Sequence, residues 1–85
     1  MKENTIYESL YAIGDTVVFI PMYRHQKQYG IQEFPIEGVI TAVRFTKAKV
    51  FYDIVDDYCG KLFDNVDSIK VGETEESIEY LKVAE

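Results

Sequence analysis

The residues in this sequence that could do chemistry are few and scattered. His25 is the only histidine and Cys59 the only cysteine. His25 lies in a polar stretch with no nucleophile at a recognisable spacing, and Cys59 lies in a turn beside Gly60 and two acids, surroundings opposite to those of a reactive cysteine. The chain contains no Walker, Rossmann, HExxH or GxSxG signature. We therefore expect a solvated loop histidine, an incidental cysteine, no catalytic residues and no enzymatic activity.

Five aspartates gather around one predicted hairpin, and carboxylate oxygens are the ligands that a hard cation such as Ca²⁺ binds. They are Asp53, Asp56, Asp57, Asp64 and Asp67. Their spacing differs from that of an EF-hand loop, which needs ligands at alternating positions and a glycine at the sixth. We interpret them as turn and edge charges, which discourage pairing of a sheet edge with another chain. A metal site stays the alternative, and we expect no metal and no cofactor.

Aromatic and basic residues are interleaved in the first half of the chain, a combination that suits single-stranded nucleic acid or an acidic peptide. The set comprises Tyr23, Arg24, His25, Lys27, Tyr29, Arg44, Lys47 and Lys49. The simpler interpretation is a loop whose tyrosines fold back onto the domain. Exposed aromatics nevertheless mark the best candidate for a protein contact. The predicted partner-binding residues are Tyr23, Arg24, Tyr29, Phe34, Arg44 and Lys47.

Charge is distributed unevenly over the 85 residues, whose formal net charge is −6. Residues 24–49 carry five cations and two carboxylates, whereas residues 50–85 carry three cations and ten carboxylates. An acidic chain has no general affinity for phosphate backbones, so the charge disfavours nucleic acid as a partner. No apolar run has the length of a signal peptide or a membrane span, and a lone cysteine cannot form an internal disulfide. We expect a cytoplasmic protein with no membrane partner.

Runs of β-branched and aromatic residues predict five strands. They cover residues 16–20, 36–45, 50–55, 61–65 and 70–71. A tight helical turn at 66–69 precedes the last strand. Gly38 suggests a bulge or a sharp bend in the second strand, and Asp53 indicates that one face of the third is at least partly wet. The predicted core side chains are Val17, Phe19, Ile40, Val43, Tyr52 and Ile54.

Two further segments lie outside these strands, one between the first and second strands and one after the last. Residues 22–34 show no period, contain Gly30 and end at Pro35, so we interpret them as a long loop or an arm that pairs with itself around Gly30. Loops of this length are often functional. Thr74 is a good N-cap, and the spacing of Ile78 and Leu81 predicts a helix over about 75–83. We expect one domain over residues 1–85.

Four motifs occur in chain order and together carry a family resemblance. They are Ile-Gly-Asp-Thr-Val at 13–17, Glu-Gly-Val-Ile-Thr-Ala-Val at 37–43, Tyr-Asp-Ile-Val-Asp-Asp-Tyr-Cys-Gly at 52–60 and Val-Asp-Ser-Ile at 66–69. The pattern resembles SH3-like barrels of the Tudor-like and KOW-like kind, and small uncharacterised phage and mobile-element proteins built on that barrel. The resemblance implies a mainly β protein, a small five-stranded barrel over about 13–71 with a short C-terminal α-helix.

The resemblance implies two kinds of site. Tudor-type domains read methylated lysine or arginine through an aromatic cage, for which the available members are Tyr23, Tyr29, Phe34, Tyr52 and Tyr58. KOW-type modules that bind RNA carry a basic face, which here exists only within 24–49. We therefore expect a non-enzymatic module for protein–protein interaction, a monomer or weak homodimer and an accessory factor of a phage or mobile element. The alternative is a nucleic-acid-binding module that uses the basic 24–49 region.

Overall fold

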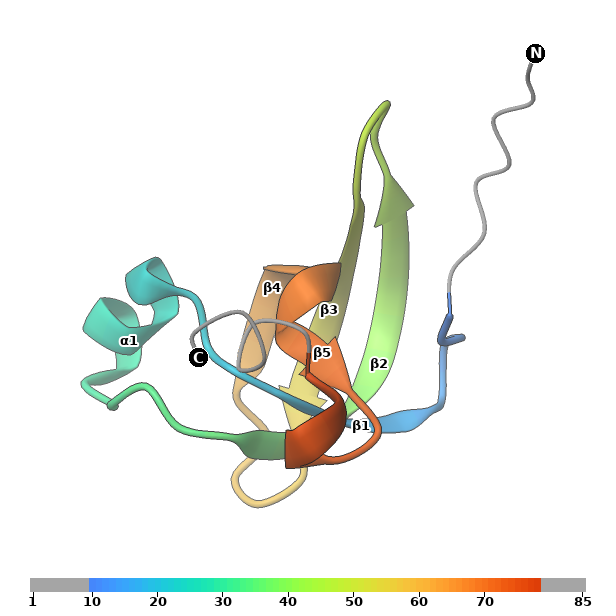
Figure 1. The fold of residues 1–85 in the computed structure, drawn as a ribbon. Coiled ribbons are helices and arrows are strands. Elements are labelled where there is room, and N and C mark those ends of the chain that lie inside the picture. The colour runs from blue at the N-terminus through green and yellow to red at the C-terminus, as the bar shows by residue number, and fades with distance from the viewer. Residues whose placement is uncertain (1–9, 79–85) are drawn as a thin grey trace, which may run out of the picture.

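The computed structural model describes residues 10–78, which form one antiparallel five-stranded sheet with one short α-helix (Figure 1). The strand order is β4-β3-β2-β1-β5. Along the chain the elements are β1 Thr16–Phe19, α1 Tyr23–Tyr29, β2 Ile36–Phe45, β3 Val50–Asp56, β4 Leu62–Asp67, the 3₁₀ turn η1 Ser68–Lys70, β5 Val71–Gly72 and the 3₁₀ turn η2 Glu75–Ser77. The prediction of a mainly β protein with five strands is confirmed.

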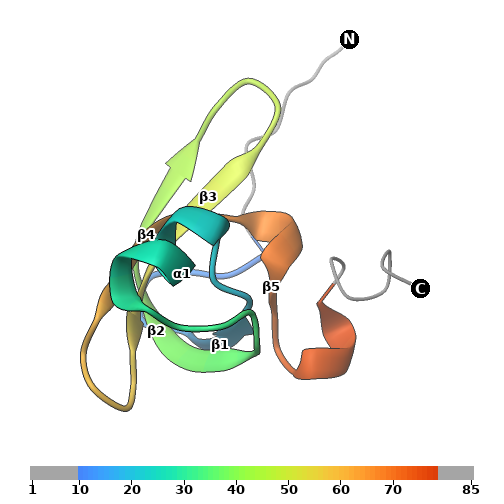
Figure 2. The same ribbon diagram turned by 90° about the vertical axis from the view of Figure 1, so that its left-hand side faces the viewer.

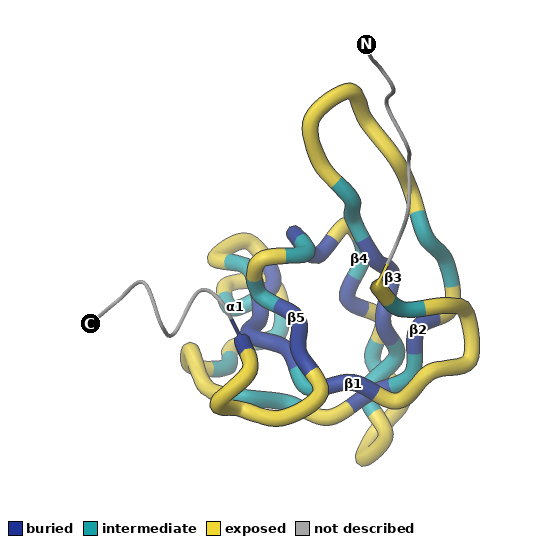
Figure 3. Tube along the Cα trace, turned by 45° about the vertical axis from the view of Figure 1, so that its right-hand side comes forward, coloured by how far each residue is buried: buried dark blue, intermediate teal, exposed yellow. Residues whose placement is uncertain are grey.

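The core lies on one side of the curled sheet. Five of the six predicted core side chains are buried, and the sixth, Val43, packs half-buried against them. Phe63 joins them through an edge-to-face contact with Phe19, with the ring centroids 5.0 Å apart. Burial of a side chain such as Phe19 stabilises the fold by about 1.5–3 kcal/mol. Figure 3 shows the buried positions following the strands around a common centre, with exposed positions on the turns.

Irregular pairing bends the long strands, although not where Gly38 predicts it. The register between β2 and β3 shifts between Ile40 and Ala42, so of the two alternatives for Gly38, a bulge or a sharp bend, the bulge is wrong. Gly38 instead serves a close approach of two strands, because a Cβ there would lie 2.5 Å from the carbonyl oxygen of Val55. A second shift, between β3 and β4, places Asn65 in the left-handed region at φ 52°. β4 ends at Asp67, two residues beyond the predicted end, so the helical turn predicted at 66–69 begins only at Ser68.

The segment predicted as a loop at 22–34 contains α1, a correction to the sequence interpretation. The helix ends at Gly30, whose φ of 65° is the left-handed conformation that glycine adopts readily. The amides of Gly30 and Ile31 both donate to the carbonyl of Gln26 and satisfy the helix end. Two turns are too short to show a helical period, and only His25 is buried on them. Within residues 10–78 no helix is long and apolar enough to cross a membrane.

The predicted helix at 75–83 begins as a single 3₁₀ turn. Ser77 Oγ accepts from the Thr74 amide at 3.0 Å, but Ile78 is extended and ends the turn. Ile78 is fully buried and packs against Gly72, where an added Cβ would lie 3.0 Å from Ile78 Cγ1. An extended backbone places this side chain under β5, so an α-helix through residue 78 is wrong. The remainder of the predicted helix, with Leu81, lies outside the described residues.

Candidate functional site

His25 is a buried anchor of α1, which corrects the expectation of a solvated histidine. Its ring is fully buried and meets Phe63 edge to face at 5.3 Å. His25 Nε2 lies 2.9 Å from Asp64 Oδ1 and 2.9 Å from Arg24 Nη1, and Nδ1 has no hydrogen-bond partner among the described residues. The hydrogen bond from His25, followed by that from Arg24, lowers the pKa of Asp64 to about 2. This cluster therefore fixes α1 against β4.

Side chains of α1 also cover the outer edge of β4, the last strand of the sheet on this side. Arg24 Nη2 donates to the carbonyl oxygens of Asp64 at 2.6 Å and Asn65 at 3.3 Å. Tyr29 Oη donates to the carbonyl of Leu62 at 2.7 Å. An open strand edge presents such carbonyls to other chains. Two of the predicted partner-binding residues, Arg24 and Tyr29, thus hold the molecule's own strand edge.

The remaining basic side chains are divided between ion pairs and the tip of the β2–β3 hairpin. Arg44 pairs with the carboxylate of Asp53 and donates to Asn65 Oδ1 at 3.2 Å. Asp53 itself is buried and also accepts from the Asn65 amide at 2.9 Å, whereas its neighbours on the same face of β3, Phe51 and Val55, are half-buried, as expected of a partly wet face. Lys49 Nζ lies 2.8 Å from Asp67 Oδ2. Lys47 is exposed on the hairpin tip, which points away from α1 in Figure 1.

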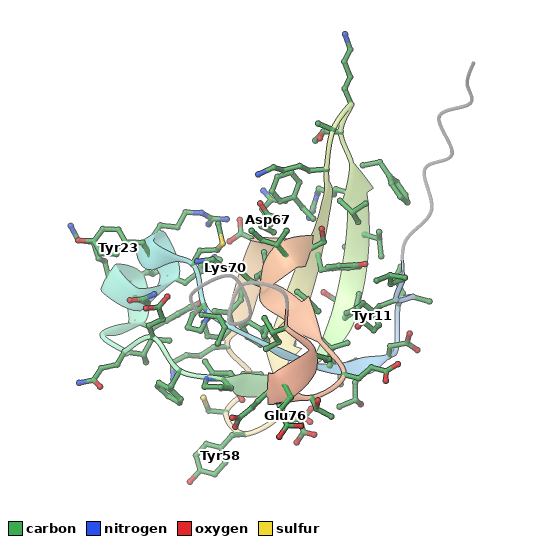
Figure 4. The ribbon with its side chains drawn as sticks, viewed as in Figure 1. Tyr11, Tyr23, Tyr58, Asp67, Lys70 and Glu76 are labelled. Carbon is green, nitrogen blue, oxygen red and sulfur yellow. The ribbon has the colours of Figure 1, made fainter. Side chains whose placement is uncertain are left out.

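Of the five aromatic residues considered for a cage, only Phe34 and Tyr58 line a common surface groove, and the other three lie in separate parts of the fold. Tyr52 is buried in the core, and Tyr29 packs on Phe63 with the ring centroids 5.1 Å apart. Tyr23 lies on the outer side of α1 with the Lys27 ammonium 5.5 Å from its ring centroid, and Tyr58 points outward from the β3–β4 turn (Figure 4). A cage needs several rings around one point, and a core residue such as Tyr52 cannot contribute a face to a surface site.

An open groove of about 490 Å³ lies between the segment that leads into β2 and the turn between β3 and β4. One wall consists of Ile31 and residues 34–37, and the other of residues 56–59 and Lys61, with Phe63 between them. Figures 1 and 2 show the two segments side by side at one end of the sheet. Volumes of about 300–1,000 Å³ are usual for binding sites. We call this feature the β3–β4 groove.

The walls of the groove are fixed by backbone hydrogen bonds, whereas its rim is exposed. The amide of Asp57 donates to the carbonyl of Glu37 at 3.1 Å, and that of Asp56 to Lys61 at 2.9 Å. Phe34 is 49% exposed and Tyr58 is 95% exposed. Of the predicted partner-binding residues, Phe34 alone lies in this groove, and of the other cage candidates Tyr58 joins it there. The opposite wall follows from the hairpin register, since pairing Phe45 with Val50 places Gly38 beside Asp56.

Charged groups on the turn keep their charge at neutral pH. Burial tends to raise the pKa of Asp56, but hydrogen bonds from the Tyr58 amide at 2.6 Å and Cys59 Sγ at 3.1 Å leave it below its usual value. The contact between Lys61 Nζ and Cys59 Sγ, at 3.1 Å, raises the pKa of Lys61. With Glu37 and Asp57, the groove carries three carboxylates and one ammonium.

Possible metal ligands and similarity to known proteins are two further observations on this site. Among residues 10–78, no group of three or more histidine, cysteine, aspartate or glutamate side chains is placed to hold a metal ion. Comparisons with protein-family models, with curated proteins and with solved structures returned no match to this chain. What the site does must therefore follow from its own geometry.

Proposed function

We propose that the protein is a small non-enzymatic module that binds a segment of another protein in the β3–β4 groove. The observation that carries the proposal is a groove whose two sides are joined by a backbone hydrogen bond from Asp57 to Glu37 and whose rim carries two exposed aromatic side chains, Phe34 and Tyr58. Aromatic side chains that stay in water on a folded domain are the usual anchors of protein interfaces. Bonded walls reduce the entropy lost on binding, because little of the site has to be ordered.

We also propose that the fold is an SH3-like barrel of the Tudor-like or KOW-like kind. The order of elements supports it: five short strands, a long first connection, two tight hairpins and a 3₁₀ turn before the last strand. Such barrels serve many unrelated functions, so the fold alone does not choose between them. The groove supplies the functional argument.

Ion pairing within the molecule argues against the nucleic-acid alternative. Three of the five cations between residues 24 and 49 face carboxylates of β3 or β4: Arg24 faces Asp64, Arg44 faces Asp53 and Lys49 faces Asp67. Phosphate binding draws its affinity from cations that release counterions. A cation that already has a carboxylate partner contributes little of that affinity, and the net charge of −6 repels the phosphates.

Site-specific photo-cross-linking tests the proposal. Tyr58 is replaced by p-benzoylphenylalanine, which keeps an aromatic side chain at the rim, and the matched control carries the same group in place of the exposed Glu76 on η2. Figure 2 shows η2 and the β3–β4 turn on different sides of the molecule. In extracts of the producing cells we expect protein adducts from position 58 that are missing from position 76. Adding Phe34→Ser should remove them.

Two results would count against the groove as the contact surface. One is the same set of adducts from both labelled positions, since that pattern reports collision and not binding. The other is a set of adducts from position 58 that persists at full yield with Phe34→Ser. The substituted side chain is half exposed, so the variant should stay folded, which the amide spectrum checks.

A further inference from the structure

The charges around the β3–β4 groove indicate the chemistry of its occupant. Glu37 and Asp57 are exposed at the rim, and within residues 10–78 neither carboxylate makes an ion pair. The single ammonium in the groove, that of Lys61, is occupied by Cys59 Sγ at 3.1 Å and lies 5.8 Å from the ring of Tyr29. The rim therefore presents two carboxylates whose charge is balanced by no neighbour in this part of the chain.

The wall beneath that rim is apolar. Ile31, Pro35 and Ile36 are half-buried along it, and the ring of Phe34 is 49% exposed at its end. Apolar surface that is rimmed by polar groups is a mark of an interaction site. An occupant gains most by covering this wall with a bulky apolar side chain while cations on either side of it meet the two carboxylates.

We propose that the groove binds a protein segment in which a bulky apolar side chain is flanked by lysine or arginine. This inference rests on the proposed function and names the class of partner. The charge of the rim selects among apolar segments, because a segment with flanking carboxylates would meet like charges.

Three matched peptides test the inference on the full chain. Each is an end-capped octapeptide of glycine and serine whose centre reads Lys-Trp-Lys, Glu-Trp-Glu or Lys-Ser-Lys. The protein contains no tryptophan, so the fluorescence of the two tryptophan peptides reports their binding directly. Amide shifts of Ile36, Asp57 and Cys59 detect and locate the binding of all three peptides. Exposed charge pairs at a rim are individually weak, so we expect Lys-Trp-Lys to bind about 5- to 20-fold more tightly than Glu-Trp-Glu. Lys-Ser-Lys should give no shifts at these amides.

Charge reversal at the rim sharpens the test. The double variant Glu37→Lys with Asp57→Lys should reverse the preference between the two tryptophan peptides. Glu76→Lys, which makes the same kind of charge change on η2, should leave the preference as it is. An unchanged amide spectrum away from the groove shows that each variant is folded.

The outcomes separate this inference from the proposed function. Equal binding of Lys-Trp-Lys and Glu-Trp-Glu in the groove overturns the basic partner and leaves the groove as an interface. Equal binding of Lys-Ser-Lys and Lys-Trp-Lys shows attraction by charge alone and also overturns it. Absence of groove shifts with all three peptides overturns it as well, while the cross-linking experiment independently decides whether the groove contacts proteins.

Discussion

The contact of α1 with β4 and the β3–β4 groove contain the same kinds of side chains, but those of the contact have partners within the molecule and those of the groove stay exposed. At the α1 contact, the guanidinium of Arg24, the hydroxyl of Tyr29 and the ring of His25 all have partners within the molecule. In the groove, the rings of Phe34 and Tyr58 remain exposed. An aromatic and charged sequence segment is therefore no guide to a binding surface until the partners of its side chains are known.

Phe63 connects the two regions, and its removal should have the largest effect. It packs against Phe19, His25 and Tyr29 and also closes the groove. Phe63→Ala should lower the free energy of unfolding by about 3–5 kcal/mol, as expected for a buried phenylalanine. Phe34→Ala, at the exposed end of the groove, should change it by less than about 0.5 kcal/mol. Urea unfolding followed by circular dichroism measures both, and similar losses would show that Phe34 is part of the core.

The contrast between these two phenylalanines shows how far the sequence can be read. Alternation along the strands identified the core, because Val17, Phe19 and Ile54 occupy positions that a half-buried sheet must cover. The run of turn residues at 56–60 likewise predicted the hairpin turn, where Gly60 has a φ of 75°. These are local signals, and the physical preference behind each acts within a few residues.

The parts that were missed depend on contacts between distant residues. His25 is buried beside Asp64, a residue 39 positions away in the chain that lies at its Nε2. The helix α1 is too short for its sequence to show a helical period. The extra residue at Asn65 is likewise held from afar, by Arg44 and by the buried Asp53. The groove was half predicted: Phe34 and Tyr58 were both named as candidates for an aromatic cage, but bringing their two walls together required the register of the β2–β3 hairpin.

Exposing the covered edge of β4 should have the next largest effect. Arg24→Ala combined with Tyr29→Phe removes the donors to the carbonyls of Leu62, Asp64 and Asn65. A hydrogen bond contributes about 0.5–1.5 kcal/mol, so the double variant should lose about 2 kcal/mol of stability. The freed carbonyls should also pair with another copy, because an open edge is a template for strand addition.

Sedimentation equilibrium at increasing concentration measures that pairing. The control is Tyr23→Ala with Lys27→Ala, which alters the exposed side of α1 and leaves the β4 contacts intact. We expect a dimer for the edge variant and the behaviour of the parent chain for the control. If the edge variant is destabilised but associates no more than the parent chain, α1 stabilises β4 without protecting its edge.

The smallest expected effect isolates the charge at the α1 contact. The pKa of Asp64 is about 2 in the folded protein, compared with an ordinary value of 3.8, because His25 and Arg24 bond to its carboxylate. A lowered pKa stabilises the fold at pH values above about 4, and this contribution disappears as the pH falls towards 2. The carboxylate is 47% exposed, so screening limits the effect, and Asp64→Asn should lower the free energy of unfolding at pH 7 by about 1 kcal/mol.

Urea unfolding of the parent chain and of Asp64→Asn at several pH values between 7 and about 2 follows that contribution. The difference between the two should hold down to about pH 4, should be only a small part of its full value near pH 2, where the parent carboxyl is half protonated, and should vanish below that pH. Asp57→Asn, a change at the exposed rim of the groove, should have the stability of the parent chain at pH 7. A difference for Asp64→Asn that keeps its full value down to pH 2 would mean that this side chain holds α1 by its shape and hydrogen bonds, and that its charge adds as little to stability as the charges at the groove.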